Sequence, residues 1–160
     1  MAVSVLAGAL ADHLGFPEEL RRNLLLAGRL QDLGKAVIWH HILNRRVSLS
    51  EIERKELEGH VPESVNIARR MGYDSPAVLE IISDHHELIN GGGYPRGLKA
   101  ADISIGARIA CVADVYCALT AWRPYREPWD RQAALSELRK GVVAEKYDAV
   151  AVDALCELLS

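Results

Sequence analysis

The sequence has 160 residues, of which 49% are hydrophobic and 26% are charged, the ordinary balance of a water-soluble globular protein. This length predicts a single compact domain over residues 1–160, with a sizeable hydrophobic core. A formal net charge of −3 excludes a general nucleic-acid-binding surface, so no DNA partner is expected, and an anionic ligand would need a local basic pocket.

The cysteines and the most apolar stretch indicate the compartment. Cys111, Cys117 and Cys156 show no CxxC spacing and are expected to be small buried thiols in a reducing environment. The most apolar stretch, residues 103–122, is interrupted by an arginine and an aspartate, which argues against a membrane span. The N-terminus does not resemble a signal peptide. We therefore expect a cytoplasmic location.

Apolar residues recur at three- and four-residue spacing along the chain, whereas the strict alternation typical of strands is missing. This pattern predicts an all-α fold, a compact bundle of about seven helices. Ser50 begins a capping box, and Asp102, Asp130 and Asp148 are expected to be helix N-caps. The longer helices are expected over roughly residues 3–14, 17–34, 51–60, 62–72, 76–86 and 103–122, with two shorter ones after them.

Residues 83–95 carry the strongest functional signal. His85, His86 and Glu87 follow an apolar run and precede three glycines and a Tyr-Pro pair. Imidazoles at the end of a helix, beside a loop that can fold back, predict a metal or anion site. Successive residues of a helix point about 100° apart, so the two histidines should reach one cluster but hardly one position on the same ion. This geometry favours a site with more than one metal.

Three further candidates lie on other predicted helices. Asp32 lies at a helix end, where its charge opposes the helix dipole and calls for a cation, either Lys35 or a metal. His60 lies at a junction of two helices, from which a side chain can enter a cavity. Asp114 lies in a close-packed stripe of small residues, and a metal ligand is favoured there over a cap or a salt bridge. The remaining histidines are expected to be solvated or partly packed: His13, His40 and His41.

Imidazole and carboxylate ligands on separate helices suit iron, manganese, zinc or nickel. A carboxylate can bridge two ions, and such a pair polarises a phosphoryl oxygen and lowers the pKa of a bridging water. Lys35 and Arg123 would neutralise phosphate oxygens. The reaction class that this set predicts is metal-assisted hydrolysis of a phosphodiester, with these candidate ligands: Asp32, His60, His85, His86 and Asp114.

The chain resembles the HD-GYP branch of the HD-domain phosphohydrolases. The resemblance covers nearly the whole sequence, from Leu24 through Tyr125, and several separated motifs occur in the right order. These motifs are Leu30-Gln31-Asp32-Leu33-Gly34-Lys35, Glu58-Gly59-His60-Val61-Pro62, His85-His86-Glu87, Asn90-Gly91-Gly92-Gly93-Tyr94-Pro95, Val112-Ala113-Asp114, Ala118-Leu119-Thr120 and Arg123-Pro124-Tyr125.

The resemblance implies a helical bundle, a centre of two or three metals, and hydrolysis of cyclic di-GMP to the linear dinucleotide or to GMP. By position, Asp32 would be the bridging carboxylate, and Lys35 and Arg123 would contact the substrate phosphate. The loop Gly92-Gly93-Tyr94-Pro95 would lie beside the ligand, and in the family it also meets diguanylate cyclase (GGDEF) domains. Whether the chain forms a homodimer is left open.

Three departures from the family pattern concern the metal centre. Gln31 occupies the place of the histidine before the bridging aspartate, and a neutral amide binds such metals far more weakly than imidazole. Asn90 replaces an acid, and Cys117 replaces an aspartate that is common in the family. One metal position has therefore lost ligands, while the other can use Asp32, His60 and His85 or His86.

Three readings follow from these departures. The first is a metal-dependent phosphodiesterase with weakened or lost catalysis, carrying one or two ions at full or substoichiometric occupancy. The second is a non-catalytic module that binds cyclic di-GMP or a GGDEF partner. The third and least favoured is a structural module, because five candidate ligands remain.

Overall fold

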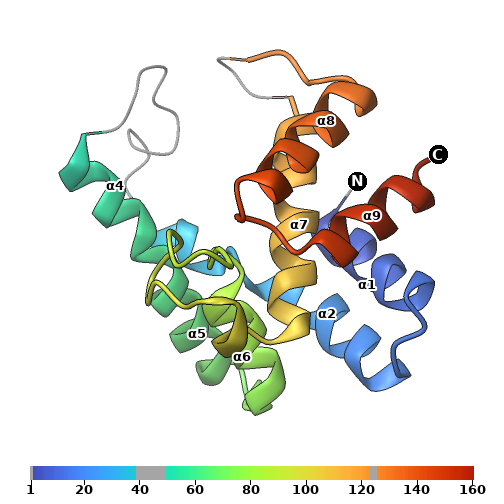
Figure 1. The fold of residues 1–160 in the computed structure, drawn as a ribbon. Helices are drawn as coiled ribbons and strands as arrows, with labels where there is room; N and C mark the ends of the chain where they lie inside the picture. The colour runs from blue at the N-terminus through green and yellow to red at the C-terminus, as the bar shows by residue number, and fades with distance from the viewer. Residues whose placement is uncertain (1, 39–49, 123–125) are drawn as a thin grey trace.

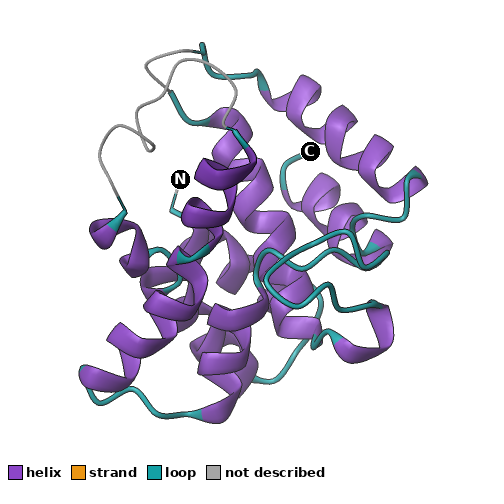
Figure 2. Ribbon diagram, turned by 90° about the vertical axis from the view of Figure 1, so that its left-hand side faces the viewer, coloured by secondary structure: helices purple, strands orange, loops and turns teal. Residues whose placement is uncertain are grey.

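The computed structural model describes residues 2–38, 50–122 and 126–160. Within these ranges the chain forms helices and no strand, and an isolated antiparallel bridge joins Asn90 to Lys99 (Figure 2). The predicted all-α fold is confirmed. The elements in chain order are α1 (Val3–His13), α2 (Glu18–Leu30), η1 (Leu33–Val37), α4 (Glu51–Glu58), α5 (His60–Arg70), α6 (Pro76–Asp84), η2 (Ala100–Asp102), α7 (Ile105–Thr120), α8 (Arg131–Val143) and α9 (Ala149–Leu158).

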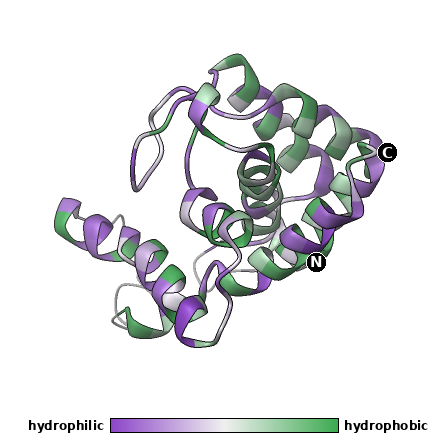
Figure 3. Ribbon diagram, turned by 90° about the horizontal axis from the view of Figure 1, so that it is seen from below, coloured by the Kyte–Doolittle hydropathy of each residue, from purple (hydrophilic) through white to green (hydrophobic). Residues whose placement is uncertain are grey.

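Helix α7 runs through the middle of the molecule and contacts α1, α2, α6, α8 and α9 (Figure 1). Seen from below, this central helix is largely hydrophobic (Figure 3). Its buried positions include small residues such as Ala107, Ala110 and Ala113, which allow neighbouring helices to approach closely. This packing places the middle of α7, and with it Asp114, next to the ends of the helices that carry the other candidate residues.

Helix α7 begins two residues later than the sequence predicted. Asp102 lies in the short 3-10 helix η2, and Ile103 has an extended backbone. The Ser104 hydroxyl accepts the hydrogen bond from the backbone N–H of Ala107 and is the actual N-cap. The prediction of Asp102 as the cap was wrong because both residues are good caps, and only the extended backbone between them decides which one starts the helix. The predicted caps Ser50, Asp130 and Asp148 are confirmed.

The short helix η1, which follows α2, is held against the start of α5 by a close contact at Gly34. The N–H of Gly34 in η1 donates to Ser64 Oγ at 2.8 Å, and Ser64 is fully buried. A Cβ at position 34 would meet the carbonyl oxygen of His60 and would lie 2.8 Å from the Ser64 nitrogen, closer than such atoms can approach. Glycine is therefore required at position 34. Because it has no side chain, η1 can approach α5 closely enough to place Asp32 next to His60.

Helix α4 stands away from the rest of the bundle and contributes no buried residue (Figure 1). It begins with the predicted capping box, in which Ser50 and Glu53 bond reciprocally. Its C-terminal end joins α5 directly at Gly59, so His60 does lie at a helix junction. Among the described helices, none combines the length and hydrophobicity needed to cross a membrane.

We expect Gly34→Ala to lower the free energy of unfolding by about 1–3 kcal/mol, the usual cost of overpacking a tight contact. The added methyl group would push η1 away from α5 and separate Asp32 from His60. Chemical denaturation checks the stability, and metal binding to the same variant checks the separation. Unchanged stability and unchanged metal affinity would contradict this account of the contact.

Candidate metal centre

Four side chains from three parts of the chain meet below the loop that follows α6. Their ligand atoms all lie within 4.8 Å of one another, and the residues are Asp32, His60, His85 and His86. Asp32 precedes η1, His60 is the first residue of α5, and the two histidines directly follow α6. Asp32 Oδ1 lies 3.5 Å from His60 Nε2 and 4.0 Å from His85 Nε2. The structure thus brings together four of the five predicted ligands.

Backbone carbonyls fix the orientation of two of these imidazoles. His60 Nδ1 lies 2.6 Å from the Leu57 carbonyl oxygen, and His85 Nδ1 lies 2.8 Å from that of Ile82. A carbonyl oxygen can only accept, so each Nδ1 carries the proton and donates it. In the neutral ring the other nitrogen, Nε2, then offers a lone pair to the centre, which is the usual arrangement of a metal-ligating histidine.

Several buried polar atoms around the centre have no hydrogen-bond partner in the described structure. They are Gln31 Oε1, Asp32 Oδ1, His60 Nε2 and His85 Nε2, all of them acceptors or lone-pair donors. Lys35 Nζ forms an ion pair with Asp32 Oδ1 at a distance of 2.7 Å, but the two groups are not oriented for a hydrogen bond. Burying such atoms without partners is costly. A cation bound among them would satisfy the group, so these residues fit a metal ion.

Burial keeps the three imidazoles neutral. It lowers the pKa of His60, lowers that of His85 to about 4, and lowers that of His86 below its usual range. The neighbouring imidazoles and the positive charge of Lys35 further disfavour protonation of His86. Neutral imidazole is the form that binds a metal. The three rings are therefore ready to act as ligands at neutral pH.

The two adjacent histidines lie beyond the end of α6 and, contrary to what the sequence had suggested, do not share a helix. Helix α6 ends at Asp84, with His85 as its C-cap and His86 beyond it. The two ring centroids lie only 3.9 Å apart, and both rings belong to the group of mutually close ligand atoms. Whether the two rings serve one ion or two stays a prediction.

Asp114 lies beside this group instead of within it. Its Oδ2 atom is 3.9 Å from His86 Nδ1, and its Oδ1 atom accepts a hydrogen bond of 3.1 Å from Gln31 Nε2. Because a carboxylate accepts and does not donate, the amide nitrogen of Gln31 must face Asp114. Gln31 is almost completely buried, and this bond turns its Oε1 atom away from Asp114. The residue that replaces a family histidine thus holds a candidate ligand.

Two buried acids outside the predicted ligand set shape the loop over the centre. The Glu87 carboxylate accepts from the backbone N–H groups of Arg96, at 2.7 Å, and Leu98, at 2.9 Å. The Asp84 carboxylate accepts from the Arg96 guanidinium at 2.6 and 2.7 Å. The loop is therefore pinned at its far side, and the Tyr94 ring lies 4.7 Å from that of His86. Glu87 stood in the quoted motif, but no local pattern paired Asp84 with Arg96.

A cavity of about 680 Å³ opens beside His86. The predicted substrate-loop residues Gly92, Gly93, Tyr94 and Pro95 line one side of it. Lys35 is not among its lining residues, and Arg123 lies outside the described residues, as do His40 and His41. Sequence reasoning missed the rest of the lining, since amphipathic helices offer no signal for which face borders a cavity: Arg54, Leu57, Glu58, Leu88, Cys111 and Val115.

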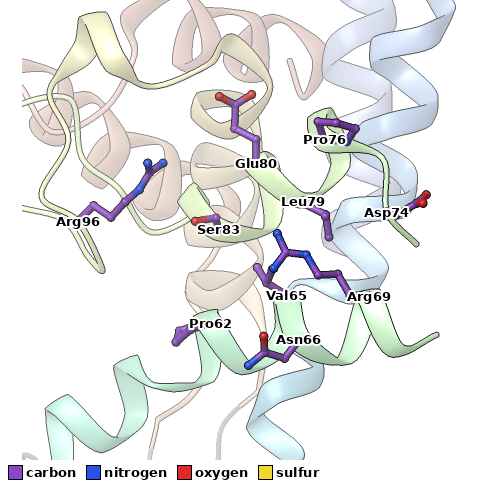
Figure 4. A pocket seen from close by; sticks show the side chains of 10 residues that line it. All are labelled: Pro62, Val65, Asn66, Arg69, Asp74, Pro76, Leu79, Glu80, Ser83 and Arg96. Atoms are coloured by element: carbon purple, nitrogen blue, oxygen red, sulfur yellow. The ribbon is translucent and has the colours of Figure 1, made fainter. Parts of the chain in front are cut away.

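A second cavity, of about 850 Å³, lies between α5 and α6 (Figure 4). Its lining includes Arg69 from α5, Glu80 and Ser83 from α6, and Arg96 from the loop. It shares no residue with the four converging ligands, so it is separate from the candidate centre. Its Arg96 side chain is already engaged by Asp84.

The sequence matches the HD domain family over residues 1–150. It is 33% identical over 153 residues to the 3'3'-cGAMP-specific phosphodiesterase 1 of Vibrio cholerae, covering 96% of this chain and 35% of that protein. It is 36% identical over 138 residues to a cyclic di-GMP phosphodiesterase of Pseudomonas aeruginosa, covering 86% and 33%. A cyclic di-GMP phosphodiesterase response regulator of Xanthomonas campestris is 35% identical over 164 residues, covering 96% and 40%.

A solved structure with the same fold is that of an HDG"Y"P protein from Bdellovibrio bacteriovorus. The TM-score is 0.78 at 24% sequence identity, with 99% of this chain and 50% of that chain covered. The chain spans about 33–40% of the length of the three curated relatives above.

Stability of the metal-free protein should fall as the pH drops from 6.5 towards 4. Over this range the unfolded chain binds a proton at position 85, whereas folded His85, with a pKa of about 4, does not. Each such group lowers the free energy of unfolding by up to about 1.4 kcal/mol per pH unit. Urea denaturation between pH 4.5 and 7.5, after removal of metal by a chelator, measures this slope.

His85→Gln should flatten that dependence, because the glutamine does not titrate. His13→Gln is the matched control, since His13 lies at the surface and pairs with Glu157. It should keep the wild-type slope. A wild-type slope in His85→Gln would contradict a neutral buried His85.

Proposed function

The chain belongs to the HD domain family, in the HD-GYP branch that its motifs indicated, and we propose that residues 1–160 form one cyclic-dinucleotide phosphodiesterase domain with a single-ion centre. The observation that carries this proposal is the convergence of four ligand atoms, three of which are buried lone pairs or oxygens without a hydrogen-bond partner. The relatives named above as phosphodiesterases of cyclic di-GMP or 3'3'-cGAMP support the substrate class.

Asp32, His60, His85 and His86 would hold the ion, and the mixture of imidazole and carboxylate suits iron, manganese, zinc or nickel. When bound, such an ion polarises a phosphoryl oxygen and lowers the pKa of a bound water. The chain itself supplies the orientation of the rings, through the Leu57 and Ile82 carbonyls. It also supplies a rigid wall on one side, in which the Tyr94 ring lies against His86.

Among the described residues, Lys35 is the cationic side chain that forms an ion pair with Asp32, one of the candidate ligands. Its ammonium group is 2.7 Å from Asp32 Oδ1, and its side chain is about one third exposed. It can therefore turn towards an incoming phosphate without leaving a buried charge behind. We assign Asp32 to the ion and Lys35 to the phosphate oxygens, with Arg123 as a second phosphate contact predicted from the sequence alone.

Gln31 weakens the place where a second ion would bind. Its Nε2 atom donates to Oδ1 of Asp114, so an amide stands beside that carboxylate where the family has an imidazole ligand. Losing one ion of a two-metal displacement removes several kcal/mol of transition-state stabilisation, about a thousandfold in rate. We therefore expect slow hydrolysis. The same hydrogen bond favours the second candidate function, a module that binds a cyclic dinucleotide without turning it over.

The purified protein should carry about one transition-metal ion per chain. Elemental analysis of the wild type measures this directly, and His60→Gln should lower the content because it removes a buried ligand. His13→Gln should not change it. Two ions per chain in the wild type would overturn the single-ion proposal, and an equal content in His60→Gln would place the ion elsewhere.

Gln31→His should increase both the metal content and the rate of cyclic di-GMP hydrolysis. The imidazole would restore a ligand beside Asp114, and the rate gain should be about tenfold or more if the second ion returns. Gln31→Leu is the control, because it removes the hydrogen bond to Asp114 without adding a ligand. Product formation and metal content are measured on the same samples. Equal turnover in the wild type and in Gln31→His would show that the wild-type centre is already complete.

The same pair of variants separates the two candidate functions. If the wild type binds cyclic di-GMP without product while Gln31→His forms product, the wild type is a binding module whose scaffold remains competent. Docking of GGDEF domains on the Tyr94-Pro95 loop stays a prediction from the sequence, and the formation of a homodimer stays open.

A further inference from the structure

Helix α4 forms the outer wall of the cavity beside His86, although it adds nothing to the hydrophobic core. Its three lining residues are Arg54, Leu57 and Glu58, which share one face because they are spaced by three and four positions. Because α4 buries no residue, a leucine between two charged residues on one face adds little to the stability of the fold. We therefore ask which ligand this cavity-facing side of α4 could bind.

The charged groups on this face are available. In the described part of the structure, the side chains of Arg54 and Glu58 form no hydrogen bond or ion pair, although Lys55 on the same helix pairs with Glu51. Glu58 is half-buried and lies outside the group of four converging ligand atoms. Burial raises the pKa of Tyr94, and the negative charges of Asp114 and then Glu58 raise it further. The Glu58 carboxylate therefore acts on a residue that lines the cavity.

A carboxylate in this position is unfavourable for a ligand that brings only phosphate. The relatives' substrates are polyanions, and an unpaired acid in the same cleft repels them. The acid becomes favourable where the ligand presents hydrogen-bond donors to it. In a cyclic dinucleotide the phosphates and ring oxygens are acceptors, and each ribose 2'-hydroxyl offers a single O–H donor. Only a base edge can present two adjacent N–H donors, which match both oxygens of one carboxylate.

Guanine is the base that fits both charges. Its Watson–Crick edge carries two adjacent donors, N1–H and the N2 amino group, which match the two oxygens of one carboxylate. Its O6 and N7 atoms are acceptors that match the fork of an arginine. Adenine instead presents the acceptor N1 to a carboxylate. The remaining lining offers apolar surface and an aromatic ring against which a base can pack: Leu57, Leu88, Tyr94, Pro95 and Val115.

We propose that Glu58 and Arg54 read one guanine of the substrate, with the Glu58 carboxylate accepting from N1–H and N2–H and the Arg54 guanidinium donating to O6 and N7. This inference rests on the proposed function, because it takes the phosphate to lie at the centre that His86 shares with the cavity. It assigns specificity to α4 and makes a guanine-containing dinucleotide the preferred ligand. The cavity volume of about 680 Å³ lies within the usual range for small-molecule sites.

The test is calorimetric binding of cyclic di-GMP and cyclic di-AMP to the full chain, which needs no turnover. The wild type should prefer cyclic di-GMP by about 10- to 100-fold, the discrimination of one good bidentate contact. Glu58→Gln should lose most of this preference, because an amide offers one acceptor and one donor where guanine requires two acceptors. Arg54→Gln should weaken binding of cyclic di-GMP more than that of cyclic di-AMP.

The controls lie on the same helix. Glu56→Gln and Lys55→Gln remove one negative and one positive charge at positions that do not line the cavity, and both should keep the wild-type preference. Melting temperatures check that each variant is folded, which is expected since α4 has no buried residue. Competition by GMP against AMP provides a second measurement of the same base preference.

The outcomes separate this inference from the function on which it rests. If the wild type binds both dinucleotides equally, or if Glu58→Gln changes both affinities by the same factor, guanine reading by Glu58 is overturned while the phosphodiesterase proposal stands. If the wild type binds neither dinucleotide, the proposed function fails and the inference fails with it. A preference for cyclic di-GMP that disappears in Glu58→Gln and persists in Glu56→Gln supports the assignment.

Discussion

The candidate centre depends on two hydrogen bonds that point away from it. His60 and His85 each donate Nδ1–H to a carbonyl oxygen three residues earlier, at Leu57 and Ile82. Both carbonyls lie in the last turn of a helix, Leu57 in α4 and Ile82 in α6. The two helix ends thereby gain a donor, and the two rings gain a fixed orientation. Each Nε2 lone pair then faces the same buried space, so the arrangement of the centre follows from the way α4 and α6 end.

The buried acceptor atoms around this space destabilise the fold unless a cation lies among them. Asp32 Oδ1 and the two Nε2 atoms are buried and have no hydrogen-bond partner in the described structure, and Lys35 reaches only the oxygen. A protein core normally pairs such atoms. The surroundings of the centre are also unfavourable for stability. The close contact at Gly34 excludes any side chain there, and the loop over the centre requires two buried acids, Asp84 and Glu87. These features make sense together if holding the centre in shape matters more than ease of packing.

Much of this arrangement was accessible from the sequence, and the reason differs from part to part. Three- and four-residue spacing of apolar residues is a local signal, and it correctly gave an all-α fold with caps at Ser50, Asp130 and Asp148. The side chains that the structure brings together were candidates from their residue type and their place on the predicted helices, and the order of the motifs, which resembles that of a known family, supported the set. The position of the cap at Ser104 and the end of α6 depended on backbone angles at single residues, which composition does not determine.

The sequence could not assign Gln31 its part, and this residue limits what the centre can do. A missing histidine predicts only the loss of a ligand, whereas the structure shows the amide bound to Asp114 and its oxygen turned away from that carboxylate. Hydrolysis needs charge stabilisation at both the attacking and the leaving oxygen, and one ion stabilises fewer of these charges than two. Binding has no such requirement, so under the proposed function one ion, Lys35 and the cavity wall formed by α4 would hold a ligand in its ground state. On this proposal the balance between binding and turnover would be set at position 31, independently of the face of α4 that would select the base.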